Sequence, residues 1–535
     1  MHYNLLIVLS LLFVVILLVL LAKRIKIAYP ILLVIAGLGI SFIPGIPNLH
    51  LDPELIFLIF LPPLLYEAAW YTSWKEFWKW KRPIILLAFG LVFFTSTIVA
   101  YVAYSYIPGF TLALGFLLGG IVSPPDAVAA STVLKGISVP KRSLVILEGE
   151  SLINDASSLI VFKFALLAVL TGSFSFQEAT QQFFIVAGMG ILLGILGALV
   201  IYGVHRFLPT TPAIDATLTV MTPYLLFLLA EHFDFSGVMA VVSGGLFMSY
   251  RSHQIFKTGS TRVNMLGVWT TMIFVMNTLV FVLIGLELPE IIAGLDTYSL
   301  NEAIKYGLLI SLIVIILRFL WVYPIAHIPR WLSAKARRDP SPGWKGPLLI
   351  SWAGMRGVVS LATALSIPLL MIDGSEFPQR NLIIFITFVV IFVTLVFQGL
   401  TLPGILKLIK LTEFDVIISD DEQQANIQLH LNVTALNLLK EKYNSFVEEN
   451  ELLSIYQSNL ENEKINIELQ LDSLECKVIK KQEIDQYHSV LLEIYSLQRK
   501  KLIKLRNDKF FSDKMIRKFE LQIDLNELQL TDTED

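Results

Sequence analysis

The fold is decided by two neighbouring stretches, GFLLGGIVSPPDAVAAS at residues 115–131 and LVILEGESLINDASSLIVF at residues 144–162. Both are hydrophobic, yet they carry carboxylates near their centres, Asp126 in the first and Glu150 and Asp155 in the second. An ionisable group is costly in hydrocarbon, so a carboxylate inside a membrane segment indicates a functional site.

The first stretch is also interrupted, because it contains Gly119-Gly120 and Pro124-Pro125. Such breaks free backbone carbonyls that a cation can use as ligands. Together with the carboxylates, they predict a protein that exchanges a cation for a proton across a membrane.

The composition divides the chain into two parts. Of its 535 residues, 55% are hydrophobic and 16% are charged, whereas soluble proteins average about 25% charged residues. Residues 411–535 hold 15 Lys and Arg against 25 Asp and Glu, a net charge of −10, so the preceding residues carry +7. We therefore expect a transmembrane domain at 1–410, a linker at 411–426 and a cytoplasmic helical tail at 427–535.

Apolar runs long enough to cross about 30 Å of hydrocarbon recur through the first part and predict about thirteen spans. Nineteen Lys and Arg residues lie in loops at alternate positions, and the intervening loops hold only Lys305 and Arg380. The positive-inside rule then places the N-terminus outside and the tail in the cytoplasm. Leu5–Ala22 has basic residues after it rather than before it, which favours an uncleaved first span over a signal peptide.

The thirteen spans suggest an internal symmetry. If the seventh is a linker, the others form two inverted six-helix repeats, and the fifth span (110–134) corresponds to the twelfth (346–372). The twelfth is interrupted by AGMRG at residues 353–357. Paired interrupted segments indicate a transporter's midplane site, so we expect helices 5 and 12 to meet there. The alternative is that their glycines serve helix packing.

The tail has no proline from Ile427 to Leu530, and its apolar residues recur at spacings of three and four, which predicts helices. A helical hairpin or coiled coil is expected. Dimer contact, regulation and solvation all remain open as its role.

Asp155 is the predicted carrier of the transported ion. Ser151 lies four residues earlier, on the same face of a helix, and a hard cation such as Na⁺ prefers oxygen ligands. Asp155 and Ser151 are therefore expected to bind the transported Na⁺, with the opened backbone around Asp126. Burial favours the neutral form of a carboxylic acid, so a single group that is either protonated or metal-bound gives exchange. The alternative is an Asp paired permanently with a basic residue.

The neighbours of Asp155 refine this prediction. Asn154 does not titrate, so one proton for one monovalent cation, an electroneutral exchange, is the simplest stoichiometry. Asp126 follows the Pro-Pro break and either neutralises a helix N-terminus or contacts the ion. Glu150 and Arg356 are expected to form an ion pair, because each requires a partner in the membrane interior. Scaffolding is the first role considered for this pair and ion chemistry the second.

Motifs for other chemistry are missing from the sequence. It contains no GxxxxGK[ST], HExxH, CxxC or GxSxG pattern, and its one cysteine, Cys476, excludes an internal disulfide and a Cys-rich metal site. Neither an enzyme nor a cofactor is predicted. The basic residues of the first part lie mostly in loops, so nucleic-acid binding is not predicted either.

The sequence resembles the monovalent cation:proton antiporter family, in particular its cation:proton antiporter-1 branch of bacterial sodium/proton antiporters and animal sodium/proton exchangers. The resemblance covers roughly residues 5–410. The matching stretches are FLPPLLYEAAW (60–70), GGIVSPPDAVAAS (119–131), EGESLINDASSLIVF (148–162), FVMNTLVFVLIGLEL (274–288) and SWAGMRGVVSLATALSIP (351–368).

This resemblance implies thirteen helices in two inverted repeats, crossed interrupted helices 5 and 12, and a homodimer with an elevator-like movement. It implies that Asn154-Asp155 marks the electroneutral branch and that Glu150 bonds Arg356. Many members read Thr-Asp-Pro in helix 5, where this chain has Pro125-Asp126-Ala127, so Ser123 is considered as a substitute ligand.

The function predicted is antiport of Na⁺, with Li⁺ or K⁺ as alternatives, against H⁺ across a bacterial inner membrane, for pH and sodium homeostasis. K⁺/H⁺ antiport is one alternative. A membrane-embedded cation or pH sensor that signals through the tail is another, and a transport assay after deletion of residues 420–535 separates it from antiport. A channel fits less well, because a single titratable site suits stepwise exchange.

Overall fold

The structure is a computed structural model of the chain, and its helices form two compact units, Met1–Phe414 and Asp415–Asp535. Its described residues are all-helical apart from loops and an isolated bridge between Leu370 and Glu376. These residues are 2–25, 27–41, 53–134, 137, 139–172, 176–256, 259–295, 298–332, 343–409, 420–475, 481–506, 515–516, 519 and 522–527.

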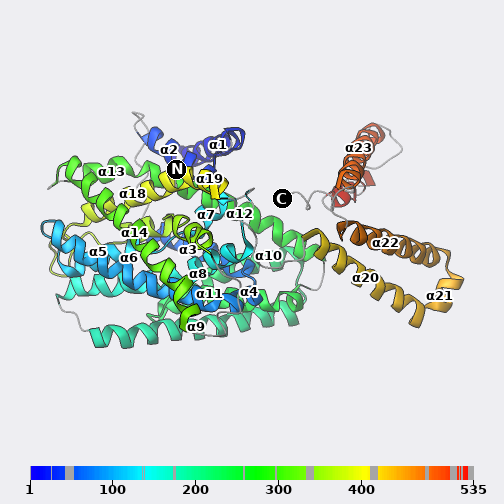
Figure 1. Cartoon of the computed structure of the whole chain (residues 1–535), viewed down its shortest axis with the longest axis horizontal. Helices are drawn as coiled ribbons and strands as arrows, with labels where there is room; N and C mark the ends of the chain where they lie inside the picture. Colours follow the sequence, from blue (N-terminus) through cyan, green and yellow to red (C-terminus); the bar gives the residue numbers. More distant parts are fainter. Residues whose placement is uncertain are drawn as a thin grey trace. The chain divides into compact units, whose positions relative to one another are not determined.

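The first unit contains the helices from α1 to α19 together with two π-helical segments (Figure 1). They are α1 (His2–Ile25), α2 (Tyr29–Ser41), α3 (Pro53–Tyr71), α4 (Trp74–Ile85), η1 (Leu86–Leu91), α5 (Val92–Tyr106), α6 (Leu112–Val122), α7 (Ala127–Leu134), α8 (Lys141–Thr171), α9 (Phe176–Phe207), α10 (Pro212–His232), α11 (Gly237–Ile255), α12 (Gly259–Leu286), α13 (Leu288–Ala293), α14 (Leu300–Leu332), α16 (Lys345–Trp352), α17 (Val358–Leu365), α18 (Arg380–Phe392), η2 (Val393–Gln398) and α19 (Gly399–Ile409).

Eight helices among the described residues are long and apolar enough to cross a membrane. Some of them join consecutive elements, such as the 33-residue helix Trp74–Tyr106 that combines α4, η1 and α5. The all-helical class is therefore confirmed for the described residues, with eight candidate spans, whereas the predicted count of thirteen spans and their repeat symmetry stay predictions.

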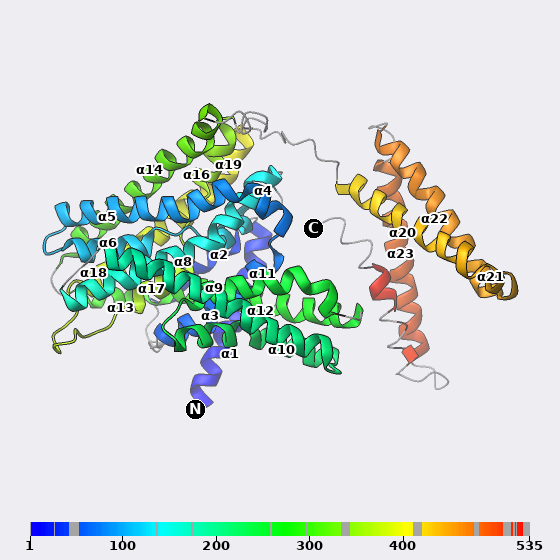
Figure 2. The same cartoon turned by 90° about the horizontal axis from the view of Figure 1, so that it is seen from below.

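Two hydrophobic clusters fill the first unit. One is built mainly from α1, α2, α4–α7, α14 and α16–α19, and the other from α3 and α9–α12, whose helices run along one side of the unit (Figure 2). Helix α8 contributes to both, with Ile146 and Phe162 in the first cluster and Leu152 and Ala156 in the second. The helix that carries Asp155 thus lies where the two clusters meet.

The breaks predicted at Pro124-Pro125 and at the AGMRG motif are present, whereas Gly119-Gly120 lies within α6. Residues 123–126 separate α6 from α7, and Ala353–Gly357 separates α16 from α17. The two breaks touch, because the Asp126 backbone N–H donates to the Met355 carbonyl over 2.6 Å. They provide non-helical backbone at one place inside the apolar unit, which is tolerated there because it is enclosed by protein.

The π-helical segment η1 fixes α8 from one side. A π-helical turn leaves carbonyls out of the regular ladder, and here the Ala88 carbonyl accepts a 2.6 Å hydrogen bond from Ser157 Oγ of α8. The Leu86 carbonyl accepts from Trp321 Nε1 of α14. η1 therefore ties both α8 and α14 into the first unit.

The second unit contains α20 (Asp420–Lys442), α21 (Asn444–Glu449), α22 (Glu451–Glu475) and α23 (Lys481–Arg506). Leu436 and Leu439 of α20 pack on Leu460 of α22, so the two helices form a hairpin. Helix α20 begins inside the range predicted as linker, and residues 411–419 and Cys476 lie outside the described residues.

Candidate functional site

A cavity of about 310 Å³ lies where the two clusters meet. Its walls come from α3, the break before α7, α8, α12 and the start of α17. Four carboxylates line it, Glu67, Asp126, Glu148 and Asp155, and the described lining residues include no Lys, Arg or His. A cavity with this lining is electrostatically suited to a cation or to protons.

Asp155 is the most buried of these carboxylates, with only 7% of its surface exposed. Within the described part of the chain, no hydrogen-bond donor contacts its carboxylate and no basic side chain pairs with it. A buried carboxylate in this position is costly unless a proton or a metal ion occupies it. The alternative of a permanent basic partner finds no support in these residues.

Asp126 and Ser151 cap the start of α7. Asp126 Oδ1 accepts from the N–H groups of Val128 and Ala129 over 2.8 and 3.3 Å, as an N-cap side chain does. Ser151 Oγ accepts from the Ala127 N–H over 3.1 Å. Because both side chains also line the cavity, they combine the helix-capping role with a position beside Asp155.

Gly357 contacts the same carboxylate from the second break. A Cβ atom at this position would lie 2.8 Å from the Cβ of Asp126 and overlap its carboxylate, which the capping bonds hold in place. We expect Gly357→Ala to cost about 1–3 kcal/mol through overpacking and to lower the melting temperature of the purified protein. Gly346→Ala is the matched control, because its Cβ meets no atom within 4 Å; equal melting temperatures for the two variants would contradict the contact.

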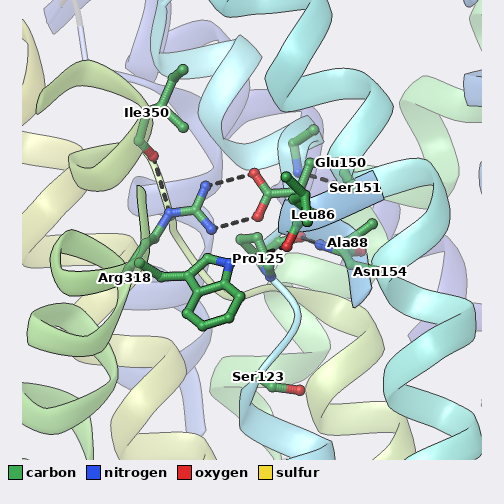
Figure 3. Close-up of polar contacts among 12 residues, drawn as sticks. Leu86, Ala88, Ser123, Pro125, Glu150, Ser151, Asn154, Arg318 and Ile350 are labelled. Atoms are coloured by element: carbon green, nitrogen blue, oxygen red, sulfur yellow. Dashed lines mark hydrogen bonds and ion pairs between the residues drawn. The ribbon is translucent and has the colours of Figure 1, made fainter. Parts of the chain in front are cut away.

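The predicted ion pair of Glu150 with Arg356 is wrong in its basic partner. Glu150 receives two hydrogen bonds from Arg318 of α14, over 2.6 and 2.9 Å, and both side chains are buried. Arg318 Nε also donates to the Ile350 carbonyl of α16 over 3.0 Å. Figure 3 shows the guanidinium facing Glu150, with the Ile350 carbonyl above it in this view. The bidentate pair joins α8, α14 and α16.

Arg356 has a different role. Its guanidinium donates to the carbonyls of Val122 and Ser123 over 3.1 and 3.4 Å and to that of Gly354. The Val122 and Ser123 carbonyls are at the C-terminal end of α6, where carbonyls lack intrahelical partners and attract a cation, and Gly354 lies in the break after α16. Arg356 therefore stabilises the end of α6, and this use of its donors explains why it does not pair with Glu150.

Asn154 and Ser123, the remaining predicted site residues, have different partners. Asn154 Nδ2 donates to the Pro125 carbonyl over 3.1 Å, while its buried Oδ1 has no partner among the described residues. Ser123 is buried, and its hydroxyl donates back to the Gly120 carbonyl. Figure 3 shows Ser123 apart from the group around Glu150 and Asn154. Ser123 is therefore not placed beside Asp155 in the cavity.

Comparison with known proteins finds a matching family and similar sequences. Residues 8–408 match the family model described as sodium/hydrogen exchanger, transmembrane. A sodium, potassium, lithium and rubidium/H⁺ antiporter of Bacillus pumilus is 37% identical over 384 residues, 70% of this chain. The matched region is 57% of that relative's length, so this chain spans little more than half of it.

Two further matches agree. The Na⁺/H⁺ antiporter ApNhaP of Aphanothece halophytica is 33% identical over 388 residues, covering 71% of this chain and 70% of the relative. The structure of the sodium proton antiporter MjNhaP1 from Methanocaldococcus jannaschii superposes with a TM-score of 0.59 at 20% identity. It covers 74% of this chain and 96% of that chain, a likeness of fold.

Proposed function

The chain belongs to the sodium/hydrogen exchanger family, and from this we propose that it is a secondary active antiporter that exchanges Na⁺ for H⁺ across a bacterial inner membrane. Its physiological role in this proposal is pH and sodium homeostasis. Li⁺ and K⁺ are the alternative cations, since the name of the Bacillus pumilus antiporter includes both.

One observation carries the proposal. The Asp155 carboxylate faces a cavity lined by acidic side chains and lacks a protein partner among the described residues. In hydrocarbon surroundings, an empty ionised carboxylate is costly to move. If the Asp155 site becomes accessible from the other side of the membrane only when it holds a proton or a cation, the proton flux and the cation flux are coupled.

The neighbouring oxygens complete the proposed cation site. Ser151 Oγ uses one lone pair for the Ala127 N–H, which leaves a second for a cation. Asp126 lies across the cavity and adds negative potential, and water fills the remaining coordination positions of a hard cation. Asn154 orients the Pro125 carbonyl and does not titrate, so the proposed exchange moves one proton for one cation.

The proposal includes an arrangement in the membrane. Thirteen spans in two inverted repeats, with α6/α7 and α16/α17 as the interrupted helices 5 and 12, put the N-terminus outside and the tail in the cytoplasm. Residues 1–410 form the transport domain, 411–426 the linker and 427–535 the tail. A homodimer is the proposed assembly. The basic residues in alternate loops and the fold likeness support this arrangement.

The test uses purified protein in vesicles that carry an internal pH indicator. We expect external Na⁺ and Li⁺ to drive proton movement, and the rate to stay unchanged when a thiocyanate gradient imposes a membrane potential. Vesicles without protein are the control. A rate that follows the potential would contradict one-to-one exchange, and a response to K⁺ alone would assign the K⁺/H⁺ alternative.

A further inference from the structure

Helix α4 has two chemically different faces. Phe77, Trp80 and Ile84 are buried against the first unit, whereas Trp74 and Trp78 are 43% and 55% exposed. The two exposed indole rings stack at 5.4 Å between centroids. Large aromatic side chains that remain exposed beside one another indicate a surface with a partner.

Lysine side chains lie near the exposed rings. Lys75 and Lys79 are exposed on the same helix, and Lys81 Nζ lies 4.3 Å from the centre of the Trp78 ring. Tyr250, at the end of α11, extends the surface: it is 58% exposed and lies 6.4 Å from Trp74. We call the set of Trp74, Lys75, Trp78, Lys79, Lys81 and Tyr250 the α4 patch.

The position of α4 in its helix indicates what covers this patch. In the helical run Trp74–Tyr106, the part after Trp80 alone has 26 residues, about 39 Å at 1.5 Å per residue, which is more than the roughly 30 Å of hydrocarbon. The N-terminal end of this run, which carries Lys75 and Lys79, is the part that must lie outside the hydrocarbon. The backbone departs from helical geometry at Trp80 (φ −103°, ψ 15°) and Pro83 follows, so the patch is set off from the apolar part.

We propose that the α4 patch binds the headgroups of anionic phospholipids at the bilayer surface. Indole and phenol rings favour the headgroup level, where an apolar body and a polar edge are both accommodated. Lysines beside them attract anionic lipid. The patch holds three Lys and no acidic residue, and the nearby Glu76 lies 3.9 Å from Lys79, so the charge favours an anionic headgroup over a zwitterionic one.

The buried face connects the patch to the ion site. The Ile84 side chain fills the space above Gly149 of α8, where an added Cβ would lie 2.6 Å from Ile84 Cδ1. The Arg142 guanidinium of α8 lies 4.1 Å from the centre of the Trp80 ring. Gly149 is less than two turns from Asp155 on the same helix. Headgroup binding at α4 therefore acts on the helix that carries Asp155, an effect that rests on the proposed function.

The binding test uses tryptophan fluorescence of the full chain in phosphatidylcholine vesicles. These contain either brominated phosphatidylglycerol or the same fraction of brominated phosphatidylcholine. We expect brominated phosphatidylglycerol to quench the wild type more strongly. The difference in quenching between the two brominated lipids should fall to less than half of its wild-type value in two patch variants. They are Lys75→Gln/Lys79→Gln/Lys81→Gln and Trp74→Phe/Trp78→Phe. The matched control, Lys500→Gln/Lys501→Gln/Lys504→Gln, removes the same charge from α23 and should keep the difference.

A difference that is unchanged in both patch variants would overturn the proposal, and so would equal quenching of the wild type by the two lipids. These readings do not depend on transport. In the same vesicles, the Na⁺-driven proton flux should rise with the phosphatidylglycerol fraction in the wild type and in the α23 control, but not in the lysine patch variant. If no protein gives any flux, the function proposed above fails while the quenching still decides the lipid site.

Discussion

Replacing Asp155 with Asn is expected to reduce Na⁺-driven proton flux to the level of vesicles without protein. The amide has nearly the same shape as the carboxyl group but neither binds a proton in this pH range nor supplies a negative ligand to a cation. The side chain has no hydrogen-bond donor to lose among the described residues. The melting temperature should therefore stay at or above that of the wild type, since an unpaired buried charge is removed.

Two other substitutions make this result specific. Asp373→Asn, in an exposed loop, makes the same chemical change far from the cavity and should exchange at the wild-type rate. Asp126→Asn keeps a good N-cap, because Asn and Asp cap helices about equally well, so we expect exchange to continue with a higher half-saturating Na⁺ concentration. Wild-type flux in Asp155→Asn would refute its role as carrier.

Local patterns in the sequence predicted much of the site. The breaks occur where Pro124-Pro125 and the AGMRG motif indicated, because these residues act on the backbone within a few positions, whereas Gly119-Gly120 lies inside helix α6. Ser151 and Asp155 share a wall of the cavity because they are four residues apart on α8. Glu148 lies seven residues before Asp155 and lines the same cavity. Because residues seven apart share one face of a helix, the sequence already indicated that the two carboxylates lie on the same side of α8.

Long-range partners were not predictable in the same way. Arg318 reaches Glu150 across 168 positions of sequence, a separation at which no local pattern pairs the two residues. The place of Arg318 near the middle of the 33-residue helix α14 indicates that it needs a partner, because a long basic side chain reaches the interface only from near a helix end, but it does not say which partner. Ser123 was considered as a substitute for the threonine that many family members have in helix 5, but its hydroxyl donates to the Gly120 carbonyl of the preceding turn.

Glu150→Gln is expected to destabilise the protein strongly, with a loss of about 3–5 kcal/mol, because it leaves the buried Arg318 without its carboxylate. The same range applies to Arg318→Met, which leaves Glu150 charged and unpaired. The double variant Glu150→Gln/Arg318→Met should recover part of the loss, since neither residue then retains an uncompensated charge. Melting temperatures of the purified proteins and their folded yields measure these changes.

A double-mutant cycle then separates the observed partner from the one predicted by sequence. Residues in direct contact show coupling of about 0.5–3 kcal/mol, and the bidentate bonds of Glu150 with Arg318 should place that pair near the upper end. The Arg356 guanidinium donates its hydrogen bonds to the carbonyls of Val122, Ser123 and Gly354. Arg356→Met should therefore destabilise by leaving those carbonyls unpaired, and its loss should add to that of Glu150→Gln with much smaller coupling. Equal coupling in the two cycles would mean that Glu150 shares its charge between both arginines.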